Sequence, residues 1–352
     1  MHGISEGTAM AGSKARRTTA TEGRLPAFGG VLALAMIAAL AGGCDRGAQG
    51  GEAAKAGADS TRASASAAQK QADEPLDYTP PGIQTLKDDE LGRSIRRGLA
   101  LVTHTKDSLP EYAPGNINCS NCHLDGGLRR DAAALIGVAA RFPKYMDRTG
   151  AVIRLEDRVN YCFTRSLAGR RIPVGSTEMR DIVAYLTFIS RGVPVGSHVR
   201  GEGMPKMPAL TGDTARGRAV FASTCTMCHG AQGQGMPPGI PAVWGAGSYA
   251  VGASMAREER AASFIRHFMP YNQPGSLTDQ QAFDVAAYIN GMPRPESPGK
   301  ENDWPHGGAP ADVPYATRGH AAHRPPARLT PRDTAGATVP APAPATRRTG
   351  AR

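Results

Sequence analysis

Two copies of a Cys-x-x-Cys-His motif constrain the fold of this chain more than any other feature. Residues 119–123 read Cys-Ser-Asn-Cys-His, and residues 225–229 read Cys-Thr-Met-Cys-His. Two cysteines at this spacing can form thioether bonds to both vinyl groups of a haem, and the next histidine then supplies an iron ligand. A single Cys-x-x-Cys also occurs in zinc sites and redox dithiols, but a histidine after both copies favours two covalently bound haem c groups. The predicted attachment and proximal residues are Cys119, Cys122, His123, Cys225, Cys228 and His229.

The segments that flank the two motifs repeat as well. Residues 86–103 carry apolar side chains at helical spacing before the first motif, and residues 214–222 begin a similar helix before the second. After the motifs, residues 181–186 (DIVAYL) and 284–289 (DVAAYI) match each other. An internal repeat with one haem motif per copy predicts an all-α fold of two tandem cytochrome c domains, with a disordered N-terminal linker and C-terminal tail.

Helix caps and composition set the predicted boundaries. Asp213 has the residue type of an N-cap, and Thr278 with Gln281 forms a capping box. A Gly/Pro-rich stretch at residues 193–208 separates the two domains. We expect an export signal of the lipoprotein type (1–44), a disordered linker (45–80), a first cytochrome c domain with the catalytic haem (81–195), a second with the electron-transfer haem (196–295) and a disordered Pro/Ala/Arg-rich tail (296–352).

The N-terminus is typical of an export signal. Basic residues from Lys14 to Arg24 precede an apolar run, residues 31–41, that is too short to anchor in a bilayer. Small residues before Cys44 resemble a lipoprotein processing site, and ordinary cleavage in the same Gly/Ala-rich stretch is the alternative. We therefore expect a periplasmic protein. If Cys44 is a lipoprotein processing site, the lipid on Cys44 would attach the protein to a membrane.

Positive charge is concentrated near the C-terminus. The chain has a formal net charge of +10, of which residues 311–352, with seven Arg and two Asp, contribute +5. A solvated arm is the simplest interpretation of this tail, and binding to an anionic surface is the alternative. Export argues against nucleic acid as a partner.

Methionines before the last helix of the second domain are candidates for the second iron ligand there. Met269 lies fifteen residues before Asp284 and is our choice, with Met255 next. Met236 follows His229 by only seven residues, which is too close to cross to the other haem face. A methionine ligand raises the haem potential and suits electron transfer.

The first domain has no comparable methionine, because Met179 falls inside the final helix and Met146 comes early. Cys162 takes the comparable position, although a lone cysteine can also be a small buried hydrophobic residue. Arg158 and Ser166 lie four residues on either side of it, on the same face if the segment is helical. A cationic neighbour favours thiolate. A thiolate-ligated haem would be a low-potential, reactive centre.

Four segments of the chain resemble the di-haem thiosulfate dehydrogenases. These segments are residues 116–124 (NINCSNCHL), 155–166 (LEDRVNYCFTRS), 178–190 (EMRDIVAYLTFIS) and 276–289 (SLTDQQAFDVAAYI). The resemblance implies an enzyme that joins two thiosulfates into tetrathionate, in some members in reverse. It also implies transfer of two electrons to an acceptor such as a small cytochrome c or another redox protein.

The same resemblance assigns roles to particular residues. It implies ligation of the active haem by His123 and Cys162, with Arg158, Ser166 and, less directly, Arg148 binding substrate. In the family's mechanism the cysteine sulfur carries or activates one thiosulfate while the haems take electrons in single steps. Many members carry a Lys beside the methionine ligand of the second haem, where this chain has Phe268 before Met269.

Two other functions remain open at this point. The first is a di-haem electron carrier without a substrate, against which the group of Arg158, Cys162 and Ser166 argues. The second is a sulfur-pathway subunit that conjugates thiosulfate to a carrier protein, which would require a partner.

Overall fold

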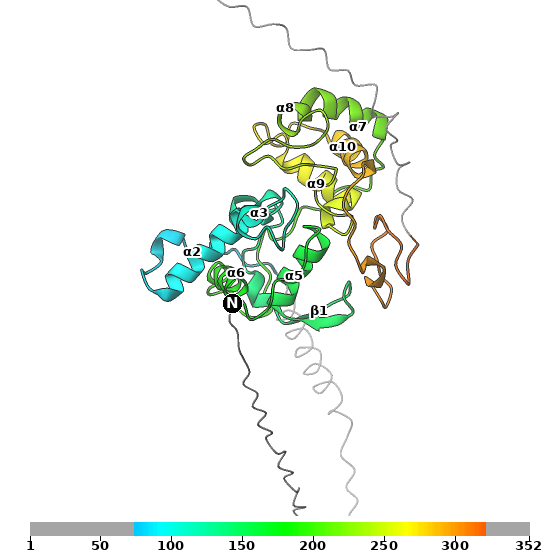
Figure 1. The fold of residues 1–352 in the computed structure, drawn as a ribbon. Coiled ribbons are helices and arrows are strands. Elements are labelled where there is room, and N and C mark those ends of the chain that lie inside the picture. The colour runs from blue at the N-terminus through cyan, green and yellow to red at the C-terminus, as the bar shows by residue number, and fades with distance from the viewer. Residues whose placement is uncertain (1–73, 322–352) are drawn as a thin grey trace, which may run out of the picture. The chain divides into compact units, whose positions relative to one another are not determined.

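The computed structural model describes residues 74–321, and this part of the chain is mostly helical (Figure 1). Its α-helices are α2 (Glu90–Thr103), α3 (Thr105–Ser108), α4 (Leu124–Gly127), α5 (Leu155–Arg165), α6 (Thr177–Phe188), α7 (Thr214–Val220), α8 (Thr226–His229), α9 (Glu258–Phe268) and α10 (Asp279–Gly291). Shorter helical turns are η1 (Ile83–Thr85), η2 (Cys119–Asn121), η3 (Val138–Arg141), η4 (Phe221–Cys225), η5 (Ser254–Ala256) and η6 (Lys300–Asn302). One antiparallel hairpin, β1 (Lys144–Met146) with β2 (Ala151–Ile153), departs from the all-α expectation.

The export signal, Cys44, most of the linker and residues 322–352 of the tail lie outside the described residues. The predictions made for those segments therefore stay predictions. Among residues 74–321, no helix is long and apolar enough to cross a membrane.

Two helix crossings form the framework, one in each haem domain. Helix α2 packs on α6, and α7 packs on α10. Each crossing has a glycine at its closest point, because a Cβ on Gly98 would collide with the Asp181 carbonyl and one on Gly217 with the Asp284 carbonyl. The predicted repeat is therefore confirmed as the same helix crossing built twice.

A matching ion pair ties each crossing together. The Nε atom of Arg97 donates to Asp181 at 2.7 Å, and the Nε atom of Arg216 donates to Asp284 at 2.7 Å. Burial raises the pKa of each aspartate, but hydrogen bonds led by the arginine lower it below its ordinary value. Both carboxylates belong to the repeated Asp-x-x-Ala-Tyr segments singled out from the sequence, which explains why those segments match.

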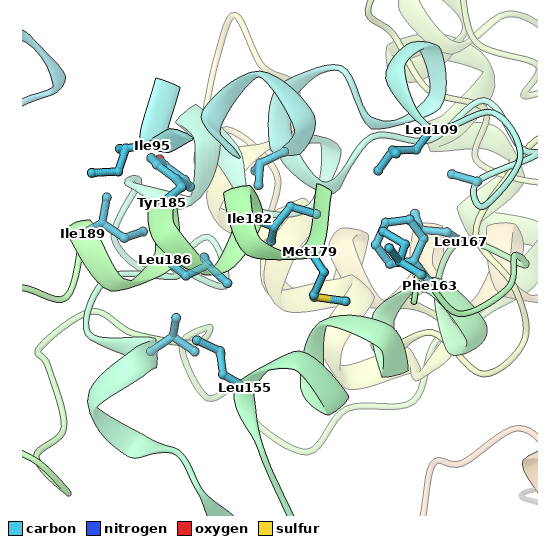
Figure 2. Packing of buried hydrophobic residues seen from close by; sticks show 14 of the residues in the cluster. Ile95, Leu109, Leu155, Phe163, Leu167, Met179, Ile182, Tyr185, Leu186 and Ile189 are labelled. Carbon is cyan, nitrogen blue, oxygen red and sulfur yellow. The ribbon is translucent and has the colours of Figure 1, made fainter. Parts of the chain in front are cut away.

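Figure 2 shows the core of the first domain, in which side chains from α2, α5 and α6 interlock. Met179 is fully buried there in the same cluster as Leu155 and Phe163, which confirms that it belongs to the core. In the second domain, Phe221, Trp244 and Tyr288 form an aromatic cluster with ring centroids 4.9–5.8 Å apart. Each domain therefore has its own apolar core.

The tail prediction is wrong for residues 296–321. Trp304, Val313 and Tyr315 are buried against one another in this segment, and Asp303 is 2 % exposed. We call residues 296–321 the strap. These side chains supply enough apolar surface and one ion-pair centre to hold a Pro/Gly-rich chain in place, which composition alone did not indicate.

The end of the linker is also ordered. Leu76 forms a parallel bridge with Val199, and the Arg130 guanidinium donates to the Tyr78 carbonyl at 2.7 Å. Val199, assigned from the sequence to the second domain, packs with Ile136 in the first. The boundary between the two domains therefore lies after this segment.

Candidate functional site

The first Cys-x-x-Cys-His motif begins on η2 and ends at His123, the N-cap of α4. The backbone N–H of Asn118 donates to the Asn121 side chain at 2.7 Å, which tightens the turn that carries the cysteines. His123 Nδ1 lies 2.5 Å from the Ala133 carbonyl. With Nδ1 held in this way, the Nε2 atom of His123 is the nitrogen left for an iron.

The second motif repeats this arrangement on η4 and α8. His229 Nδ1 lies 3.0 Å from the Pro241 carbonyl, twelve residues ahead in the chain. Burial lowers the pKa of His229, which favours the neutral imidazole that binds iron. Both histidines thus have the orienting carbonyl that a metal-bound histidine needs.

Three of the motif cysteines are shielded enough from solvent that burial raises the pKa of the thiol. Burial raises the pKa of Cys119 to about 11 and that of Cys122 to about 12. Burial likewise raises the pKa of Cys225 to about 12. Neutral sulfurs beside an oriented histidine, in an apolar domain core, fit a covalently bound haem at each motif.

Helix α5 carries the third sulfur of the first domain. It runs over Leu155–Arg165, so this segment is helical and Arg158 and Cys162 lie one turn apart on the same face. An Nη atom of Arg158 donates to Cys162 Sγ at 2.7 Å. The guanidinium and the sulfur therefore form one unit.

Cys162 behaves in the opposite way from the motif cysteines. Burial raises its pKa, but the charge of Arg158 and a hydrogen bond from His123 outweigh burial and lower the pKa to about 6. The structure therefore places His123 and Cys162 near each other. A histidine and a thiolate would be suitable ligands for a haem iron, and this assignment stays a prediction.

Ser166 ends helix α5. Its backbone N–H donates to the Cys162 carbonyl at 2.8 Å, and its own carbonyl accepts from Ala250 at 3.0 Å. The structure places Ser166 one turn beyond Cys162, as predicted, and links it to the second domain. Its role in binding substrate stays a prediction.

Arg148 has a different environment from the one the sequence suggested. It donates to Asp303 at 3.0 Å and to the Tyr315 hydroxyl and the Gly252 carbonyl at 2.6 Å each. Its guanidinium also lies over the Trp304 ring at 4.9 Å. These contacts direct Arg148 to the strap, so a direct role in substrate binding stays a prediction.

Asp303 is the residue that sequence reasoning missed. It accepts from Tyr161 at 2.5 Å and from Arg165 at 3.0 Å, both on helix α5 and next to Cys162 or Ser166 in the chain. Arg165 also donates to the Pro298 carbonyl at 2.9 Å. The strap thus holds the helix that carries Cys162. In the sequence, the Asp303-Trp304 pair inside a Pro/Gly-rich tail was the signal that could have indicated an ordered segment.

The predicted methionine ligand lies at the end of α9. Met269 is half-buried and packs against both Phe264 and Phe268, and Met255 is half-buried in the same clusters. Met236 is 39 % exposed. Met269 and Met255 both lie in the core of the second domain, so the choice of Met269 stays a prediction.

Two families of known domains match the chain. Residues 111–195 match the SoxA/TsdA cytochrome c domain, and residues 214–293 match cytochrome c. The first match contains helix α5 with Cys162, and the second contains Met269. Both fall inside the two haem domains predicted from the repeat.

Similar whole proteins are also known. The thiosulfate dehydrogenase of Psychrobacter arcticus is 40% identical over 239 residues, which cover 66% of this chain and 73% of that protein. The thiosulfate dehydrogenase of Allochromatium vinosum is 39% identical over 227 residues, which cover 62% of this chain and 84% of that protein. A solved structure of thiosulfate dehydrogenase (TsdBA) from Marichromatium purpuratum is 32% identical, with a TM-score of 0.60 over 63% of this chain and 50% of the solved chain.

Proposed function

This chain belongs to the thiosulfate dehydrogenase family, and from that premise we propose that it is a di-haem enzyme that oxidises thiosulfate to tetrathionate. Two covalent haem c groups are held by the motif cysteines, with His123 and His229 as proximal ligands. The reaction joins the sulfane sulfurs of two thiosulfate dianions in one S–S bond and releases two electrons. No proton is taken up or released, and the reverse reaction uses the same residues.

The hydrogen-bonded pair of Arg158 and Cys162 carries this proposal. The 2.7 Å contact from the Arg158 guanidinium favours the thiolate form of Cys162, which is the form that binds iron and acts as a nucleophile. A bound haem supplies an iron that accepts single electrons at this sulfur. An electron carrier needs no cation beside its axial ligand, whereas an enzyme that binds thiosulfate at that sulfur does.

Repulsion between the two thiosulfate dianions explains why this site requires positively charged side chains. Two dianions held ~5 Å apart repel each other by about 3 kcal/mol even at the dielectric constant of water, and by more in a partly buried pocket. The guanidinium of Arg158 offsets part of this repulsion and can donate paired hydrogen bonds to sulfonate oxygens. Ser166, one turn further along, places a hydroxyl donor on the same side of the helix.

The second domain acts as the electron relay. His229 and Met269 would hold its haem, and a methionine ligand would give that group a high potential, which suits electron transfer. The electrons then pass to an acceptor such as a small cytochrome c or another redox protein.

The enzyme works in the periplasm, with Cys44 as a lipid-modified N-terminus. Mass spectrometry of membrane-purified protein tests this, and a soluble product that begins elsewhere would contradict it.

Turnover of the full-length holoenzyme tests the function itself. The purified protein, given thiosulfate and a redox dye, should reduce two equivalents of dye for each tetrathionate formed. The same protein given tetrathionate and a reduced dye should release two thiosulfates. Haems that stay oxidised in excess thiosulfate, without any tetrathionate, would contradict the proposal and leave an electron carrier in its place.

A further inference from the structure

A second pair of cations lies beside Arg158. Arg141 ends the turn η3, and Lys144 begins strand β1 three residues later. Burial lowers the pKa of Arg141 and of Lys144, and the positive charge of Arg158 lowers both further. Three cations from separate elements therefore lie within electrostatic range of one another, and one of them, Arg158, donates to the sulfur of Cys162.

Arg141 has a donor that the protein does not satisfy. One of its Nη atoms donates to Glu202 at 2.8 Å, and its side chain is only 17% exposed. Its Nε atom is buried and has no hydrogen-bond partner among residues 74–321. Leaving a buried guanidinium N–H unpaired costs free energy, so the site lacks an acceptor that a ligand can supply.

The nearby carboxylate does not neutralise this cluster. Glu202 pairs with Arg141, but it also accepts from His198 at 2.5 Å and from the backbone N–H of Val199 at 3.0 Å. Lys144 lies over the Phe142 ring at 5.5 Å. Among residues 74–321, the acidic groups that contact these cations are Glu202, at Arg141, and the Cys162 thiol, at Arg158, so positive charge is in excess.

We propose that Arg141 and Lys144 form an oxyanion subsite beside Arg158 that holds the sulfonate group of one of the two thiosulfates. This inference rests on the proposed function. A single guanidinium, already donating to Cys162, is too little charge for two dianions that must meet sulfur to sulfur. The unpaired Arg141 Nε–H and the Lys144 ammonium give the second sulfonate its own donors, and Arg158 bridges the two positions.

A carboxylate of the bound haem has the same chemistry as a ligand for these cations, and the experiment separates the two. Full-length holoenzymes carrying Arg141→Gln, Lys144→Gln or Arg141→Lys are compared with wild type. Arg191→Gln is the matched control, because Arg191 is exposed in the same domain and its guanidinium lies over the Phe188 ring. Sulfate serves as an unreactive tetrahedral dianion in calorimetric titrations, and the KM for thiosulfate is measured in parallel.

The subsite predicts that both Gln variants raise the sulfate Kd and the thiosulfate KM by roughly tenfold or more, with haem content and haem potentials unchanged. Arg141→Lys should recover part of the loss, and Arg191→Gln should match wild type. Unchanged Kd and KM would overturn the inference. So would variants that change haem content or potential without changing the sulfate Kd, because the cations would then serve the haem carboxylate.

Failure of the function and failure of the subsite give different results. A wild-type enzyme that does not oxidise thiosulfate would refute the proposed function, while the sulfate titrations would still decide whether the anion subsite exists. A wild type that oxidises thiosulfate but binds no sulfate, with variants of normal KM, would refute only the subsite.

Discussion

The two haem domains share one scaffold and differ in what accompanies the haem motif. Each has a glycine-spaced helix crossing, an Arg–Asp ion pair at 2.7 Å and a histidine whose Nδ1 faces a backbone carbonyl. In the first domain a thiolate-prone cysteine paired with an arginine lies beside that histidine. In the second, the candidate methionines lie among aromatic and aliphatic side chains. The comparison teaches that the shared scaffold positions the haem motif in both domains. A few side chains near the motif histidine then determine whether the domain catalyses a reaction or transfers electrons.

Removing one haem at a time should have the largest effect and would separate the two roles. Cys119→Ala/Cys122→Ala should hold one haem, by pyridine haemochrome, and should lose all thiosulfate turnover. Cys225→Ala/Cys228→Ala should also hold one haem, but its remaining haem should still be reduced by thiosulfate while electron delivery to the acceptor fails. Two haems in either variant would refute the attachment sites.

Arg158→Gln should sharpen the difference between the centres. We expect kcat/KM for thiosulfate to fall by roughly 10- to 100-fold, because the variant loses a charge-assisted donor to the substrate and to Cys162. The matched control is Arg154→Gln at the N-cap of the same helix, where the side chain is 60% exposed. Equal losses of kcat/KM in the two variants would indicate an effect of overall charge and would contradict a specific role for Arg158.

Met269→Gly should affect the relay and leave substrate binding intact. The near-infrared band of methionine-ligated ferric haem should disappear, and the potential of the second haem should fall while the KM for thiosulfate stays near that of wild type. Met255→Gly should keep the band. The opposite pattern would move the ligand to Met255.

Asp303→Asn should have the smallest effect on turnover and a clear effect on stability. We expect the free energy of unfolding to fall by about 3 kcal/mol, because Arg148 and Arg165 lose a buried carboxylate. Asp312→Asn, in the same strap but 20% exposed, is the control and should cost less. Chemical denaturation of both holoproteins measures the difference, and equal costs would contradict a special role for Asp303.

The pH dependence of stability in wild type and in Asp303→Asn gives a further test of the Asp303 ion pairs. Burial raises the pKa of Asp303, but hydrogen bonds from Arg165 and the charge of Arg148 lower it below its ordinary value. A lowered carboxyl pKa contributes stability that is present above a pH of about 4 and is lost as pH falls through the lowered value. Wild type should therefore lose more stability than Asp303→Asn on acidification, and parallel acid curves would contradict this.

Most of the fold could be predicted from the sequence because its signals are local. The haem motifs, the Asp213 N-cap, the capping box at Thr278 and the repeated final helices depend on residues within one or two turns of each other, and the structure confirms the helices and both caps. Arg158 and Cys162 were also predictable, because they are four residues apart on one helix.

The features that could not be predicted from the sequence depend on contacts between residues far apart in the chain. The strap is held by an aspartate that pairs with arginines 138 and 155 residues earlier, a relation that composition cannot reveal. Arg148 was assigned to substrate by resemblance, but its guanidinium bonds to that strap. Arg141 looked ordinary in the sequence, because its unpaired Nε atom follows from packing against Glu202 and not from any motif.

The most direct test of the account is the turnover of Cys162→Ser with both haems in place. If Cys162 is the reactive sulfur at the first haem, this variant should fold normally, hold two covalent haems and lose thiosulfate oxidation by at least roughly 100-fold. Haem content and the near-infrared band of the second haem, measured on the same sample, confirm that only the first centre has changed. Turnover near that of wild type in a fully loaded Cys162→Ser enzyme would contradict the account, because the two haem domains would then no longer differ in the residue held to be catalytic.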